Sequence, residues 1–145
     1  MSPPLVLDAD GLAALSEQQP PERLRALLGE AWRRRSEVLV PALVCAECCR
    51  GVRRTRAVEA ALSRHRSARV ARPAVRVVVT DFDLARRVGS VLHAANSDSS
   101  DIVDAHSVAI AAMHGGGIVV TADPADIERL ASSLPAVRVV TQLAR

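Results

Sequence analysis

The chain has 145 residues, of which 49% are hydrophobic, and this is enough to bury the core of one domain. No apolar stretch approaches the roughly 20 residues of a membrane span, and the segment MSPPLVLDAD lacks the basic and long apolar parts of a secretory signal. We therefore expect a cytoplasmic protein with a single domain over residues 1–145. The formal net charge is +3 and all 19 cationic side chains are arginines, a composition that suits a polyanionic partner.

Five short runs of mainly β-branched residues predict buried strands, and segments with helical spacing lie between them. In chain order, strands are expected at 5–7, 38–40, 75–80, 117–121 and 137–140, and helices at 21–35, 42–66, 81–95, 101–114 and 123–134. Strands that alternate with helices of these lengths form parallel βαβ units. The predicted fold is a three-layer α/β/α domain with a central parallel sheet of four to five strands.

Carboxylates stand where several of these elements meet. Asp8 and Asp123 follow predicted strands, Glu47 lies in the helix after the second strand, and Asp101 and Asp104 begin a helix. Ligands of such sheets collect beyond the carboxyl ends of the strands. A cluster of carboxylates repels itself unless cations neutralise it, and Mg²⁺ and Mn²⁺ prefer oxygen ligands of this kind. Such a site suits hydrolysis of a phosphodiester.

Most of these acids also have an ordinary structural explanation. One acid can form a turn or cap a helix while the next lies in the first turn, or two acids can form a capping box. Three pairs of acids have this spacing: Asp8 with Asp10, Asp101 with Asp104, and Asp123 with Asp126.

Glu47 has no such explanation, because it lies in the apolar stretch PALVCAECC, where an unpaired charge would be costly to bury. Arg50 follows it by three positions, so we expect Arg50 to pair with Glu47 or, less favoured, to contact a substrate phosphate. Arg53 is a second candidate for phosphate contact.

The cysteines and histidines do not predict a site. Two of the three cysteines are adjacent and no second Cys/His pair has metal-ligand spacing, so we expect reduced thiols that pack as small hydrophobes. The four histidines share no spacing that suggests a site, and we expect them to be structural or exposed: His65, His93, His106 and His114.

Four segments in this order resemble the PIN domain, in particular the VapC-type toxins of bacterial toxin–antitoxin modules. The segments are LVLDADGLAAL, VPALVCAECCRG, DIVDAHSVAIAA and GGGIVVTADPADIERLA. They supply an Asp after the first strand, an A-E-x-x-R-G helix, a D-A helix and a T-x-D turn. The resemblance covers nearly the whole chain and implies a parallel sheet flanked by helices.

This resemblance also implies an activity and a set of residues that perform it. It implies a Mg²⁺- or Mn²⁺-dependent ribonuclease that commonly dimerises and is inhibited by a cognate antitoxin. By motif position, the implied catalytic and metal-binding residues are Asp8, Glu47, Asp104 and Asp123, with Asp101 and Asp126 as auxiliary acids and Thr121 orienting an acid or a water.

Two other functions remain open from the residues alone. The segment LDADGL is similar to the D-x-D-G-T signature of haloacid-dehalogenase-like phosphatases, but Leu12 replaces the Thr and the chain has no lysine to neutralise a phosphoaspartate. A catalytically silent PIN-like module that binds RNA or a protein is the second alternative.

Overall fold

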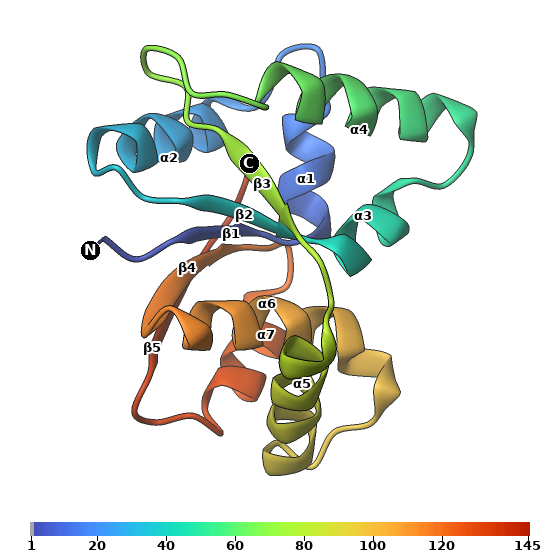
Figure 1. The fold of residues 1–145 in the computed structure, drawn as a ribbon, viewed down its shortest axis with the longest axis vertical. Coiled ribbons are helices and arrows are strands. Elements are labelled where there is room, and N and C mark those ends of the chain that lie inside the picture. The colour runs from blue at the N-terminus through green and yellow to red at the C-terminus, as the bar shows by residue number, and fades with distance from the viewer. Residues whose placement is uncertain (1) are drawn as a thin grey trace.

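The computed structural model describes residues 2–145 and has one five-stranded sheet at its centre (Figure 1). All strands are parallel, and their order across the sheet is β3-β2-β1-β4-β5. The strands are β1 (Leu5–Leu7), β2 (Val38–Pro41), β3 (Val75–Val78), β4 (Gly116–Val120) and β5 (Arg138–Gln142). The predicted parallel sheet is confirmed, with five strands.

Helices cover both faces of the sheet, which makes three layers (Figure 1). One face carries α1 (Ala9–Leu15), α2 (Glu22–Arg33), α3 (Ala42–Cys48) and α4 (Val52–Arg64). The other carries α5 (Phe82–Ala94), α6 (Ile102–Met113) and α7 (Pro124–Ala131), with a short 3₁₀ turn, η1 (Ser99–Asp101), before α6. Side chains alternate between the two cores along each strand, as the pleat requires: Leu5 and Leu7 of β1 pack against the first set of helices and Val6 against the second.

Two expectations about the helices are wrong. The predicted helix 42–66 is two helices, because the backbone turns at Gly51, whose φ of +86° lies in the region that favours glycine. Helix α1 was not expected; it is only seven residues long and contains Asp10 and Gly11, which are weak helix formers. Packing explains its presence, because Leu12 and Leu15 are fully buried.

The sheet order determines where the acids meet. Strand β1 is central, with β2 on one side and β4 on the other. Its carboxyl end continues into Asp8, that of β2 into α3, and that of β4 into Thr121. Three separate segments therefore converge at one edge of the sheet. No helix in the part of the chain that the structure describes is long and apolar enough to cross a membrane.

Candidate active site

Asp8 is the most enclosed acid of the site, with 5% of its surface exposed. Its carboxylate accepts hydrogen bonds from Ser107 Oγ on α6 (3.4 Å) and from Thr121 Oγ1 after β4 (3.1 Å). Burial raises the pKa of Asp8, and these hydrogen bonds oppose that rise because they stabilise the charged form. The carboxylate is held in one orientation by donors from two other elements.

Asp104, in the first turn of α6, lies close enough to Asp8 for each carboxyl group to shift the pKa of the other. Burial, followed by the negative charge of Asp8, raises the pKa of Asp104 to about 7. Two carboxyl groups this close cannot both ionise freely, so near neutral pH they hold a proton between them. A divalent cation bound there would replace that proton.

Thr121 joins Asp8 to the next acid along the chain. Its hydroxyl donates to Asp8 Oδ2 and accepts a hydrogen bond from the backbone N–H of Asp123 (3.1 Å). The negative charge of Asp126 raises the pKa of Asp123, with smaller contributions from burial and from Asp8. Thr121 thus links the Asp8 carboxylate to the backbone of the turn that carries Asp123. The grouping of possible metal ligands found among residues 2–145 includes neither Asp8 nor Asp123.

Asp101 and Asp126 lie on the outer side of the same cluster. One carboxylate oxygen each from Asp101, Asp104 and Asp126 lies within 4.8 Å of the other two, a grouping that could hold a metal ion. Arg129 of α7 already contacts two of these acids: its Nη2 lies 2.9 Å from Asp101 Oδ2 and 3.6 Å from Asp126 Oδ1. Asp101 also accepts a hydrogen bond from Ser97 Oγ (2.7 Å), and Ser97 followed by Arg129 lowers the pKa of Asp101.

The capping explanations fail for most of these acids. The side chains of Asp8, Asp101 and Asp123 make no capping hydrogen bond at the helices they precede, within residues 2–145. Asp98 does cap: its carboxylate accepts from the Ser100 N–H at 2.9 Å. Asp10, in the first turn of α1, lies 3.6 Å from Arg145.

Glu47 differs from the expectation of a buried charge that needs a partner. It is exposed on α3, because its side chain faces away from the buried Val44 and Cys48 of the same helix. Among residues 2–145 it has no ion pair, and the expected pairing with Arg50 is wrong: Arg50 Nε donates to the carbonyl of Ala46 at 3.2 Å. Helix α3 nevertheless begins at the edge of the sheet that carries Asp8, so Glu47 stays a candidate ligand by position.

The cysteines and histidines have structural or surface positions. All three cysteines are free, and burial raises the pKa of Cys48 to about 11, which keeps that thiol protonated. His65 and His106 are buried and contact the carbonyl oxygens of Pro73 and Ile102 through Nδ1, and His93 is exposed.

Ser107 and Arg129 were missed from the sequence. Ser107 is a polar residue in the apolar run AHSVAIAA and follows Asp104 by three positions. This spacing places both residues on the same face of the helix, so the sequence pattern could have indicated Ser107 as a site residue. Arg129 follows Asp126 by three positions in the same way. Its contact with Asp101, 28 residues away, had no local signal.

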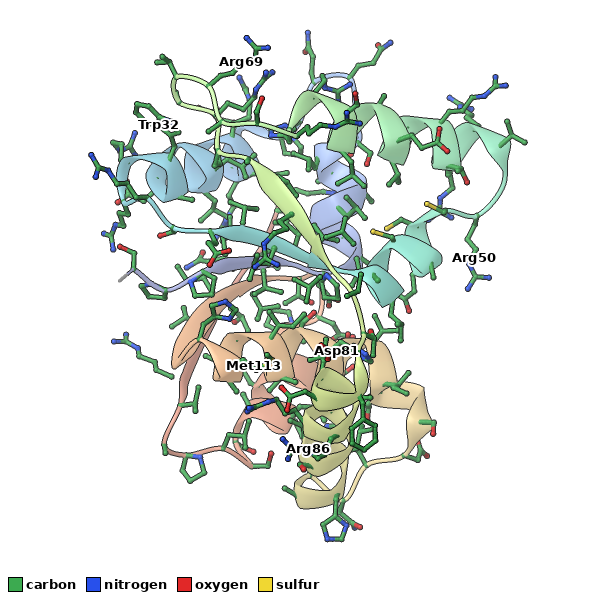
Figure 2. All side chains as sticks on the ribbon, viewed as in Figure 1. Trp32, Arg50, Arg69, Asp81, Arg86 and Met113 are labelled. Carbon is green, nitrogen blue, oxygen red and sulfur yellow. The ribbon has the colours of Figure 1, made fainter. Side chains whose placement is uncertain are left out.

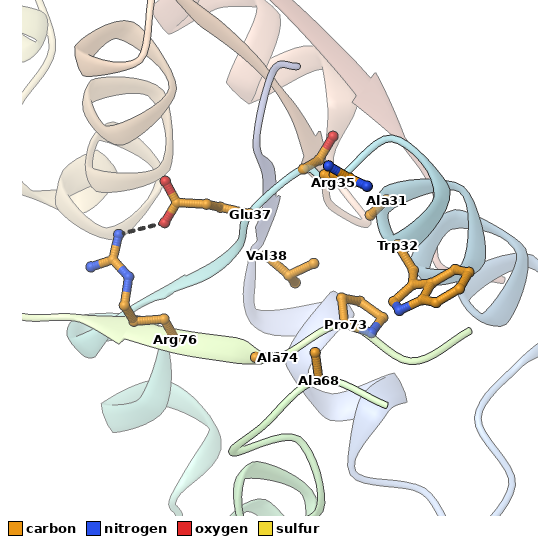
Figure 3. Close-up of a pocket in the computed structure, with 10 residues that line it drawn as sticks. Ala31, Trp32, Arg35, Glu37, Val38, Ala68, Pro73, Ala74 and Arg76 are labelled. Atoms are coloured by element: carbon orange, nitrogen blue, oxygen red, sulfur yellow. Dashed lines mark hydrogen bonds and ion pairs between the residues drawn. The ribbon is translucent and has the colours of Figure 1, made fainter. Parts of the chain in front are cut away.

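A separate cavity of about 400 Å³ lies at the amino ends of β2 and β3, the opposite edge of the sheet from the acids (Figure 3). Trp32 lines one side of it, and the ion pair of Arg76 with Glu37, at 2.9 Å, lies on the other. This cavity contains none of the predicted site residues.

Comparison with known proteins gives one family and several similar folds. A profile of the PIN-domain family, described as "PIN domain", matches residues 6–132. No curated protein sequence matches the chain.

Three solved structures share the fold at low sequence identity. FitAB bound to an IR36 DNA fragment has a TM-score of 0.60 at 18% identity, covering 97% of this chain and 94% of that one. VapBC2 from Rickettsia felis, bound to a DNA fragment from its promoter, has a TM-score of 0.61 at 13% identity, with coverages of 94% and 97%. FitAcB from Neisseria gonorrhoeae has a TM-score of 0.58 at 19% identity, with coverages of 94% and 96%. These likenesses agree with the three-layer parallel architecture.

Proposed function

The chain belongs to the PIN-domain family, and from this premise we propose that it is a divalent-metal-dependent endoribonuclease, the toxin of a toxin–antitoxin pair. The observation that carries the proposal is the convergence of Asp8, Asp104 and Asp123 from three separate elements. Family membership also disfavours the phosphoaspartate alternative, and Asp10, its required acid, is paired with Arg145 instead.

The residues of the cluster fit a hard divalent cation. In residues 2–145, no arginine or histidine forms an ion pair with Asp8, Asp104 or Asp123. Burial is the largest cause of the raised pKa of Asp8 and of Asp104, and the negative charge of Asp126 is the largest cause for Asp123. A bound cation would oppose each of these shifts. Oxygen-only donors with uncompensated charge are the chemistry that Mg²⁺ and Mn²⁺ select.

Asp8, Asp104 and Asp123 would hold the cation, and Glu47 would complete its ligands directly or through a water. A cation held there supplies activation of a water nucleophile and stabilisation of the charge that develops on the phosphoryl group. The chain's own contribution is orientation. Ser107 and Thr121 fix the Asp8 carboxylate, and the same Thr121 hydroxyl fixes the backbone of Asp123.

An RNA substrate is supported by the arginine-rich segment that follows α3. Residues 50–72 contain eight arginines and one acid, Glu59, and none of the eight forms an ion pair within the described chain. Figure 2 shows the Arg50 and Arg69 side chains pointing outward at two ends of this segment. Along α4, three exposed arginines share one helical face, at Arg53, Arg56 and Arg64. Guanidinium groups without counter-ions suit phosphate oxygens.

The partners proposed are a cognate antitoxin and a second copy of the chain. FitAB and VapBC2 were both solved bound to DNA. By analogy with toxin–antitoxin proteins of this fold, the chain would be held inactive in the cytoplasm by its antitoxin and would act as a homodimer once released.

The test is cleavage of a mixed RNA pool by purified chain freed of any bound antitoxin. The assay compares Mn²⁺, Mg²⁺ and EDTA, with Asp104→Asn as the active-site variant. Asp83→Asn, on the surface of α5, is the matched control. Cleavage that needs metal, persists in the control and vanishes in Asp104→Asn supports the proposal. A folded wild type that binds Mn²⁺ but cleaves no RNA favours the catalytically silent binding module instead.

A further inference from the structure

The guanidinium of Arg129 lies inside the outer part of the acidic cluster. Its Nη2 is 2.9 Å from Asp101 Oδ2 and 3.6 Å from Asp126 Oδ1, and its Nη1 donates to Ser97 Oγ at 2.9 Å. Ser97 in turn donates to the same oxygen of Asp101. Arg129 is therefore connected to α7, on which it lies, and to the segment that leads into α6.

The grouping of Asp101, Asp104 and Asp126 that could hold a metal ion thus already contains a cation. A guanidinium stays charged at every physiological pH, and its planar fork matches carboxylate oxygens. The inner acids are different, because no cationic side chain of residues 2–145 pairs with Asp8 or Asp104. The cluster therefore has an outer part, in which two carboxylates share one guanidinium, and an inner part whose acids have no cationic partner in the described residues.

We propose that Arg129 is a built-in counter-cation that occupies the outer carboxylates, so that the site takes one divalent ion at the inner acids and not a second one at Asp101 and Asp126. The inference rests on the proposed metal site. It makes Arg129 a positioning residue, and it assigns Asp101 and Asp126 the task of holding Arg129 in place of a metal.

The charge balance explains why Arg129 would decide the number of ions. If Arg129 is removed, Asp101 and Asp126 lose their counter-ion while their oxygens stay within reach of Asp104. Three carboxylates within 4.8 Å then form a set of oxygen ligands suited to a second divalent cation. If Arg129 stays, a second ion would have to bind beside a fixed positive charge, which repels it.

The experiment counts Mn²⁺ ions on the whole chain by isothermal titration calorimetry and by electron paramagnetic resonance of free Mn²⁺. The informative variant is Arg129→Gln, and Arg129→Lys restores a positive charge. Arg87→Gln is the matched control, because Arg87 is exposed to nearly the same degree (46% against 45%) and pairs with Asp83 away from the site. Thermal melts verify that each variant is folded.

We expect one Mn²⁺ in the wild type, in Arg129→Lys and in Arg87→Gln, and two in Arg129→Gln. A second variant, Asp101→Asn, leaves Arg129 in the chain and should still bind one ion, which tests the assignment independently of whether Arg129→Gln folds. Equal stoichiometry and affinity in wild type and Arg129→Gln, two ions in the wild type, or loss of the ion in Asp101→Asn would each overturn the inference.

RNA cleavage measured alongside separates this inference from the proposed function. If Arg129→Gln binds an additional ion while no form cleaves RNA, the proposed role of Arg129 is supported and the proposed nuclease activity is refuted. If the wild type cleaves RNA but Arg129→Gln binds the same number of ions, the nuclease activity is supported and the role of Arg129 is refuted. Absence of Mn²⁺ binding in every form refutes both.

Discussion

Replacing Asp104 by Asn should stabilise the metal-free protein at alkaline pH while it removes the proposed activity. The pKa of Asp104 is raised from 3.8 to about 7, so in the folded state its ionisation is opposed by burial and by Asp8. The unfolded chain ionises near 3.8. A carboxyl whose pKa rises on folding makes the folded state less stable as pH increases from the unfolded to the folded value. Asn carries no charge at any pH and avoids this loss.

The size of the effect follows from the width of the pH window. Each pH unit corresponds to about 1.4 kcal/mol, so the roughly two units between pH 5 and pH 7 set a ceiling of about 3 kcal/mol. Asp104 is only half-buried, and solvent screening lowers the expected value to about 1–2 kcal/mol. Above pH 7 both states are ionised and the difference stays constant.

The assay is urea unfolding in EDTA at pH 5 and pH 8. From pH 5 to pH 8, the free energy of unfolding of the wild type should fall by about 1–2 kcal/mol more than that of Asp104→Asn. Asp83→Asn is the control. Arg87 and Arg86 hold the pKa of Asp83 below its usual value, so its contribution is lost only in more acidic solution. If the free energy of unfolding depends on pH in the same way in the wild type and in Asp104→Asn, the ionisation of Asp104 is not opposed by burial and by Asp8.

Three further predictions concern other residues. Thr121→Val removes the hydroxyl that orients Asp8 and Asp123. It should lower the free energy of unfolding in urea by about 1–2 kcal/mol and reduce RNA cleavage, whereas Thr121→Ser should retain most of the stability and most of the cleavage. Gly51→Ala should lower the free energy of unfolding by about 1–2 kcal/mol because the φ of Gly51 is +86°. Gly89→Ala, inside α5 with open space around it, should instead raise the free energy of unfolding by about 0.5–1 kcal/mol. Equal effects of the two substitutions would contradict the account of the break between α3 and α4. Replacing three arginines of α4 by Gln, at Arg53, Arg56 and Arg64, should weaken RNA binding. The slope of log affinity against log salt concentration, measured by fluorescence anisotropy, should fall by about 2, and an unchanged slope would show that α4 does not contact the RNA.

Local sequence patterns were sufficient for the sheet and for the positions of the acids along it. The runs LVL, VLV and GIVVT are apolar on both faces, which is typical of buried parallel strands, and the structure has strands at all three. Parallel strands bring their carboxyl ends to one edge, so Asp8 and Asp123 were expected to meet there.

Helix boundaries followed the sequence less closely where backbone angles decided them. The pattern around Gly51 continues the helical spacing on both sides, but the folded chain leaves the helix at Cys49, with ψ of 60°, and turns at Gly51, with φ of +86°, which separates α3 from α4. The exposure of Glu47 follows from the packing of α3, whose buried side carries Val44 and Cys48. An apolar stretch of sequence does not show which side of a short helix faces the core.

The sequence by itself predicted the strands and the elements that carry the candidate acids, and only the tertiary structure decided which hydroxyl groups and cations contact those acids. Ser107 and Asp8 are 99 residues apart, Thr121 and Asp8 113, and Arg129 and Asp101 28. Each contact depends on the rotation of one helix or turn against another, which is set by packing across the two cores. Periodicity reports which residues are buried, but it carries no information about which side chains from distant segments come within hydrogen-bonding distance.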